Sequence, residues 1–170
     1  MIAVDTNLLV YAHREDSPWH AASLAAVRQL AEGRLPWAIP WQCVHEFLSV
    51  VTHPRIYAPP TPLPAAIAQV ESWLESLSLV VLTEGEGYWP RLRECLVGGR
   101  IAGPRVHDAR MAALCLHHGV RELWTADRDF GRFPALRTRN PLLGLADEIH
   151  EGGAEAAKAA RSPRTKRQRT

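Results

Sequence analysis

Short apolar runs alternate along the chain with longer stretches in which apolar residues recur at a helical period. The runs predict strands at 1–5, 37–40, 79–82 and 122–125, with a shorter candidate at 137–139. The periodic stretches predict helices from Ser17-Pro18 to Gly33, and at 42–51, 65–77, 85–97 and 106–118, with Gly119 as the C-cap of the last. Residues 8–12 keep an apolar character up to a break at His13–Pro18, and no element is assigned to them. Alternating strands and helices indicate an α/β fold, a parallel sheet of about five strands flanked by helices on both faces.

The length and charge divide the chain into a domain and a tail. With 170 residues, of which 46% are hydrophobic, the chain can form one domain with its own core. We expect that domain at 1–147, followed at 148–170 by an Ala-rich and then basic, disordered tail. Residues 1–150 hold 14 basic and 16 acidic side chains, whereas 151–170 hold six basic and two acidic ones. Bulk charge therefore does not make the domain a nucleic-acid binder, and local chemistry must decide.

The sequence predicts a cytoplasmic protein with no membrane partner. No apolar run approaches the roughly 18 residues of a membrane span, and the start MIAVDTN lacks the basic region of a signal peptide. Cys43, Cys95 and Cys115 are odd in number and widely spaced. We expect them to be buried and reduced, and to form neither disulfides nor a zinc site.

Acidic residues follow two of the predicted strands. Asp5 ends the first strand, and Asp127 and Asp129 follow the fourth. In a doubly wound sheet these strand ends can meet at the switch point, where ligands bind, and Asp108, at a helix start, can face the same crevice. Carboxylates ~5 Å apart repel by roughly 3 kcal/mol at an effective dielectric of ~20. Such a cluster favours a hard cation, Mg²⁺ or Mn²⁺, although each acid alone is also explained as a turn or helix-capping residue.

Other charged residues give weaker signals. By helical period Glu46 lies outside the apolar arc of its helix, so a solvated position is the simpler interpretation. The arginines near the acids are either phosphate contacts or solvated charges: Arg105, Arg110, Arg128 and Arg132. The histidines at 45, 53, 107, 117 and 118 lack metal-binding spacing, and we expect structural or surface roles for them.

Four segments in order, AVDTNLLVYA, HEFLSV, HDARMAALCLHHGV and ELWTADRDF, together resemble the PIN-domain ribonucleases. Within that family the chain is most similar to the VapC-type toxins of bacterial toxin–antitoxin pairs, over about residues 1–143. The resemblance implies a PIN fold and assigns metal-binding, catalytic roles to Asp5, Glu46, Asp108 and Asp127. Asp129 competes with Asp127 for the fourth place, and Thr6 and Asn7 match supporting positions of the first motif.

The resemblance also implies the chemistry and the partners. It implies an endoribonuclease dependent on Mg²⁺ or Mn²⁺ that hydrolyses RNA phosphodiester bonds by metal-activated water, leaving 5′-phosphate and 3′-hydroxyl ends. It further implies a cognate antitoxin and a homodimer or toxin–antitoxin hetero-oligomer. The apolar helix faces near Trp73 and Trp89 are either contact surfaces for these partners or ordinary core.

Two other functions compete with this prediction. A phosphoryl-transfer enzyme of the haloacid-dehalogenase type needs an acid at position 7, where Asn7 stands, and a receiver domain needs an Asp after the third strand and a Lys after the fifth. The only lysines are Lys158 and Lys166, in the tail. The alternative that stays open is a catalytically silent PIN-like module that binds RNA or protein, which would place Glu46 away from Asp5.

Overall fold

The computed structural model describes residues 1–143 and contains a five-stranded sheet in the order β3-β2-β1-β4-β5. All four strand pairings are parallel. The strands are β1 (Ile2–Val4), β2 (Trp37–Pro40), β3 (Leu79–Leu82), β4 (Glu122–Trp124) and β5 (Thr138–Arg139). The α/β prediction and all five predicted strands are confirmed. The predicted tail at 148–170 lies outside the described residues.

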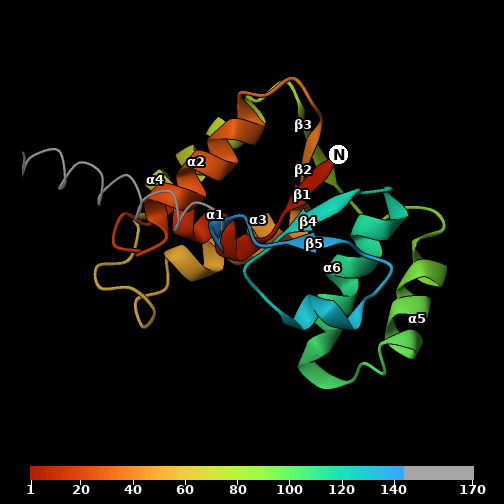
Figure 1. Ribbon diagram of the computed structural model, residues 1–170. Helices are drawn as coiled ribbons and strands as arrows, with labels where there is room; N and C mark the ends of the chain where they lie inside the picture. Colours follow the sequence, from red (N-terminus) through yellow and green to blue (C-terminus); the bar gives the residue numbers. More distant parts are fainter. Residues whose placement is uncertain (144–170) are drawn as a thin grey trace, which may run out of the picture.

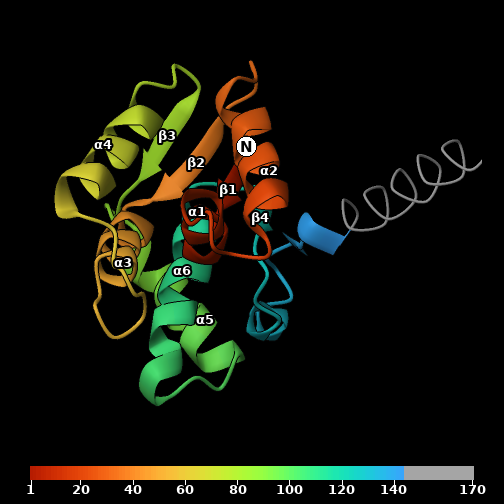
Figure 2. The same ribbon diagram turned by 90° about the vertical axis from the view of Figure 1, so that its left-hand side faces the viewer.

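Helices cover both faces of the sheet. They are α1 (Thr6–His13), α2 (His20–Ala31), α3 (Trp41–Val51), α4 (Leu63–Leu74), α5 (Tyr88–Gly98) and α6 (Val106–His117). Figure 1 shows α2 and α4 on one side of the sheet and α5 and α6 on the other. Figure 2 shows α1 and α3 close together, and α3 contacts both α1 and α4. Within the described part of the chain, no helix is long and apolar enough to cross a membrane.

Helix α1 occupies the segment for which the sequence predicted no element. Asp5 has an extended backbone and caps this helix, accepting a hydrogen bond from the Thr6 amide. The period was hidden because the helix is buried on more than one side: Leu8 and Leu9 are both fully buried. Burial stabilises each by about 1.5–3 kcal/mol, so tertiary packing, rather than an amphipathic pattern, sets this helix.

The start of α2 and the end of α6 can be compared with the predictions made for them. The predicted start of α2 at Ser17-Pro18 is wrong, since Ser17 instead closes a turn in which its hydroxyl and carbonyl accept from the amides of Trp19 and His20. Helix α6 ends at His117, one residue before the predicted end, and Gly119, the predicted cap, has φ +63°. Only glycine adopts that left-handed conformation readily, and the Val120 amide can then close the helix on the Cys115 carbonyl.

The chain reverses its direction of winding between β1 and β4. Strands β2 and β3 extend the sheet from one edge of β1, and β4 and β5 extend it from the other. Val4 pairs with Trp124, and the next amide, that of Asp5, donates to the Trp124 carbonyl across 3.0 Å. This is the topological switch point of the sheet, so side chains that follow β1 and β4 face a common crevice.

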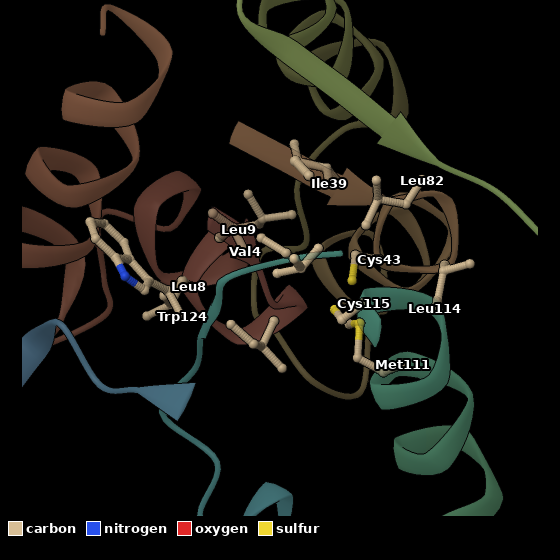
Figure 3. Packing of buried hydrophobic residues seen from close by; sticks show 14 of the residues in the cluster. Val4, Leu8, Leu9, Ile39, Cys43, Leu82, Met111, Leu114, Cys115 and Trp124 are labelled. Atoms are coloured by element: carbon tan, nitrogen blue, oxygen red, sulfur yellow. The ribbon is translucent and has the colours of Figure 1, made fainter. Parts of the chain in front are cut away.

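The core lies between the sheet and the helices that position the acids. Figure 3 shows Val4 next to Cys43, with the sulfur of Cys115 close by, and Leu8 beside Trp124. All three cysteines are buried and unpaired by disulfides, as predicted. Burial raises the pKa of the Cys115 thiol to about 12, so it behaves as a small apolar group. The elements that carry Asp5, Glu46 and Asp108 therefore share one close-packed support.

Candidate active site

A pocket of about 750 Å³ opens where β1 and β4 end. One face each of α1, α3 and α6 forms its wall, together with the segment that follows β4. Four carboxylates line it: Asp5, Glu46, Asp108 and Asp127. The structure thus brings together the four acids named from the sequence, from positions up to 122 residues apart.

Asp5 is the anchored member of the four. It is 7% exposed, and both of its carboxylate oxygens are fixed by hydrogen bonds. Oδ1 accepts from the Thr6 amide at 2.7 Å, and Oδ2 accepts from the Asn7 side-chain amide at 2.7 Å. The supporting positions of Thr6 and Asn7 therefore have a physical basis, since they set the orientation of this carboxylate.

Thr125 is a site residue that the sequence reasoning missed. Its hydroxyl donates to Asp5 Oδ2 at 2.6 Å and accepts from the Asp127 amide at 2.9 Å and from Asn7 at 3.0 Å. The side-chain oxygen of Asn7 in turn accepts from the Ala126 amide. A signal was present, because a threonine that directly follows a buried strand and precedes an acid by two residues can form such a turn.

Glu46 is exposed to solvent and also lines the acidic pocket. Its side chain is exposed, as the helical period predicted, but the polar face of α3 faces the pocket. The Thr6 hydroxyl donates to Glu46 Oε2 at 2.6 Å, which ties this carboxylate to the residue next to Asp5. The arrangement that would have favoured a silent module, with Glu46 far from Asp5, is not found.

Of the two acids after β4, Asp127 lines the pocket and Asp129 does not. Asp127 Oδ1 accepts from the Asp129 amide at 2.8 Å, so the two form a turn in which Asp127 lies nearer the strand. Asp129 lies 3.8 Å from Arg132 in an exposed pair. This geometry supports Asp127 for the fourth place among the candidate ligands.

The acids perturb one another. Burial, opposed by the hydrogen bonds from Thr125 and Thr6 and reinforced by the negative charges of Glu46 and Asp127, raises the pKa of Asp5 to about 6. Burial, followed by the charges of Asp127 and Asp129, also raises the pKa of Asp108. Burial and, after it, the neighbouring acids thus raise the pKa of two carboxyls in one pocket, where a bound cation would stabilise their ionised forms.

The carboxylates of the pocket are chemically suited to bind a hard divalent cation. It offers carboxylate oxygens, which Mg²⁺ and Mn²⁺ prefer, and no cysteine lines the pocket. Within residues 1–143, no three His, Cys, Asp or Glu side chains stand close enough together to hold an ion as they lie. Asp5 is fixed by its hydrogen bonds, and Glu46 and Asp127 are exposed on the same pocket wall, so these carboxylates would hold a cation together with Asp108.

Basic and aromatic groups complete the wall. Arg110 lines the pocket and donates from Nε to Glu84 at 2.6 Å, whereas Arg105 and Arg128 are exposed and lie outside the pocket wall. Two histidines expected to be structural or surface residues, His45 and His107, are exposed but line the pocket. The helical period could not reveal this, because it gives a polar face without saying what that face meets.

Comparison with known proteins identifies the family. The PIN domain model matches residues 2–136. The chain belongs to the PIN-domain family. It is 35% identical over 144 residues to Ribonuclease VapC43 of Mycobacterium tuberculosis, which spans 85% of this chain and 97% of that protein. It is 31% identical over 140 residues to Ribonuclease VapC48 of the same species, over 82% and 97% of the two chains.

Solved structures share this PIN fold. VapC20 of Mycobacterium tuberculosis, described as a toxin that cleaves the Sarcin-Ricin loop, has a TM-score of 0.57 at 18% identity, covering 77% of this chain and 93% of that one. VapBC2 of Rickettsia felis, bound to a DNA fragment from its promoter, also has a TM-score of 0.57, at 20% identity and over 82% and 98% of the chains. At these identities the likeness concerns the fold, and the resemblance seen in the sequence is confirmed for the family.

Proposed function

We propose that this protein is the toxin of a toxin–antitoxin pair, an endoribonuclease that depends on Mg²⁺ or Mn²⁺. The observation that carries this proposal is the anchored Asp5 carboxylate at the switch point, surrounded in one pocket by Glu46, Asp108 and Asp127. Relatives named as VapC ribonucleases, at 31–35% identity over most of the chain, support the same activity. A silent binding module is less favoured, because every acid of the family pattern is present and faces the pocket.

The pocket residues have distinct roles in this proposal. Asp5, Asp108, Glu46 and Asp127 would hold the cation, with Asp5 oriented by Thr6, Asn7 and Thr125. A bound divalent ion supplies Lewis acidity, which lowers the pKa of coordinated water and offsets charge on the leaving oxygen. Thr6 keeps Glu46 near Asp5, and Arg110 is the lone arginine or lysine on the pocket wall within the described residues. Its terminal guanidinium nitrogens are available for a phosphate oxygen.

Single-stranded or looped RNA is the substrate that this pocket suits. An open pocket beside a sheet edge can receive unstacked nucleotides, whereas the body of the chain lacks the positive charge that binds a duplex by its phosphates. Hydrolysis by an activated water requires no 2′-hydroxyl nucleophile, so the products would carry 5′-phosphate and 3′-hydroxyl ends.

The partners follow from the relatives. Solved neighbours include VapBC2 of Rickettsia felis and FitAcB of Neisseria gonorrhoeae, the latter with a TM-score of 0.56 at 18% identity. We propose a cognate antitoxin that covers the acidic pocket, and a homodimer or toxin–antitoxin hetero-oligomer in the cytoplasm. Of the two surfaces named from the sequence, Trp73 is 6% exposed and belongs to the core, whereas Trp89 is 63% exposed and can take part in contacts.

Sequencing of the 5′ ends of cut RNA tests the activity. Purified protein with Mg²⁺ or Mn²⁺ is expected to produce discrete 5′-phosphate ends, and EDTA to abolish them. Asp5→Asn is expected to fold normally, by circular dichroism, and to leave RNA intact. Normal cleavage by this variant, or cleavage unaffected by EDTA, would disprove the proposal.

A further inference from the structure

The pocket changes character along its length, from acidic to apolar and aromatic. Helices α1 and α3 both start directly after a strand, β1 and β2, and they pack against each other. The pocket wall is polar where Thr6, at the start of α1, is hydrogen-bonded to Glu46, midway along α3. Four residues further along each helix the wall is apolar, with Val10 on α1 and Val50 on α3. Four residues correspond to about 6 Å of helix, so an apolar region lies one helical turn from the acids.

Two tyrosines line this apolar region. Tyr11 follows Val10 on α1, and Tyr57 comes from the loop after α3. Both rings are partly buried and pack against the core, and this packing holds them in place. Within residues 1–143, no aspartate or glutamate of the pocket wall lies on this further turn of α1 or α3.

Arg14 contacts the loop that carries Tyr57 at several points. The Arg14 guanidinium lies 4.1 Å from the centre of the Tyr57 ring. It donates to Asp16 through Nε and a terminal nitrogen, and to the Pro59 carbonyl and the Thr61 hydroxyl through the other. The Arg14 side chain is 12% exposed. Its donors are thus committed within the protein, which leaves it unable to take a phosphate without breaking this loop contact.

We propose that Tyr11 and Tyr57, with Val10 and Val50, form a subsite for one unpaired nucleobase next to the scissile phosphate of the RNA. The subsite offers flat, largely apolar surface and no uncommitted positive charge, so it suits an uncharged ring and not a phosphate. Bases extruded from a strand are held in this way, by stacking on aromatic side chains. The exposed Ser49 hydroxyl, one residue from Val50 on the pocket wall, is placed to contact a base edge.

This inference rests on the proposed ribonuclease function, but binding can be measured without cleavage. The probe is a short single-stranded RNA, compared with versions that carry one abasic position on either side of the cleavage site. We measure RNA binding by the Asp5→Asn protein, which is the parent in this experiment. The same measurement is made on double variants that also carry Tyr57→Leu or Tyr57→Phe. We expect Tyr57→Leu to weaken binding on the order of 5- to 100-fold and Tyr57→Phe to bind as the parent does. Thermal unfolding checks that each variant folds.

The abasic RNA separates stacking from a structural effect. We expect one abasic position to weaken binding by the parent and to remove most of the difference between parent and Tyr57→Leu. The matched control is Trp89→Leu, which removes a ring that is 63% exposed on α5 and outside the pocket, and should change nothing. An equal loss with intact and abasic RNA would overturn the subsite, as would unchanged binding by Tyr57→Leu.

Further outcomes keep the two proposals apart. If the parent binds RNA with the abasic effect and yet the unmutated protein cuts no RNA, the subsite stands and the ribonuclease function fails. If cleavage occurs and depends on Asp5 while tyrosine variants cut normally, only the subsite fails. Absence of RNA binding together with tyrosine-dependent binding of an antitoxin peptide would assign this region to protein recognition and overturn the inference.

Discussion

The hydroxyl of Thr125 donates a hydrogen bond to Asp5 Oδ2 across 2.6 Å, between residues that follow two neighbouring parallel strands. The same hydroxyl accepts from the Asp127 amide. One oxygen atom therefore sets the relative positions of two candidate metal ligands. The role of Thr125 is to position these acids, because in this arrangement its lone pairs are used within the protein.

Removing the Thr125 hydroxyl tests whether it positions Asp5 and Asp127 without being needed for folding. We expect Thr125→Val to lower the affinity for Mn²⁺ and the kcat for RNA cleavage by about 10- to 100-fold, with a smaller effect on KM. Thr125→Ser restores the oxygen and should recover most of the activity. Mn²⁺ affinity by calorimetry and steady-state kinetics would check this. Equal damage in both variants would point to packing of the threonine methyl group instead.

The stability of the metal-free protein should fall as Asp5 ionises. The pKa of Asp5 is raised from 3.8 to about 6, so folding favours its neutral form. This contribution is fully present below pH ~4 and is lost as the pH rises through ~6, a change of about 3 kcal/mol. The Asp5→Asn variant lacks it, so its stability relative to the parent should increase over the same range.

Urea unfolding in EDTA at pH 4 to 8 measures this difference. Glu71→Gln, at an exposed position of α4, is the control and should show a constant difference from the parent. A constant difference for Asp5→Asn as well would contradict the raised pKa. Added Mg²⁺ should stabilise the parent at pH 7 and have little effect on Asp5→Asn.

Glu46 offers a test of charge against hydrogen bonding. Glu46→Gln removes the negative charge and keeps an acceptor for Thr6, whereas Thr6→Val removes the hydrogen bond and keeps the charge. If Glu46 holds the cation, Glu46→Gln should lower kcat by at least about 100-fold and Thr6→Val by less. The reverse order would show that Glu46 serves only to orient α1. Cleavage assays with Glu71→Gln as the matched control decide between them.

The two acids after β4 should differ in effect. Asp127 lines the pocket and contributes to the raised pKa of Asp5, whereas Asp129 is exposed and pairs with Arg132. We expect Asp127→Asn to abolish most cleavage and Asp129→Asn to retain it within about threefold, since exposed pairs contribute 0–1 kcal/mol. Initial rates with Mn²⁺ over a concentration series measure this, and a larger loss in Asp129→Asn would reverse the assignment.

Arg110 should act on substrate binding. We expect Arg110→Ala to raise KM for RNA about tenfold with a smaller change in kcat, because a charged hydrogen bond to phosphate is worth about 1.5–3 kcal/mol. Arg105→Ala, outside the pocket wall, is the matched control. Equal effects of the two substitutions would indicate general electrostatic attraction instead.

Several features could be determined from the sequence because they depend on local order. Short apolar runs fixed β2 and β3 to the residue, and the position of Asp5 after β1 placed it at the edge where parallel strands bind ligands. Gly119 marked the end of α6 because only its backbone readily adopts that turn. Family motifs named the four acids, which no single spacing would have justified.

Only the tertiary structure decided the rest. A fully apolar segment carries no period, so α1 became visible only once its burial from several sides was known. A helical wheel places Glu46 on the polar face of α3, but it does not show that this face lines the pocket and that Glu46 accepts a hydrogen bond from Thr6. The bond between Thr125 and Asp5 spans 120 residues, and the aromatic region of the pocket joins α1 to a loop 46 residues later. Such contacts depend on how the sheet brings distant strands side by side, and that arrangement is set by packing of the whole chain.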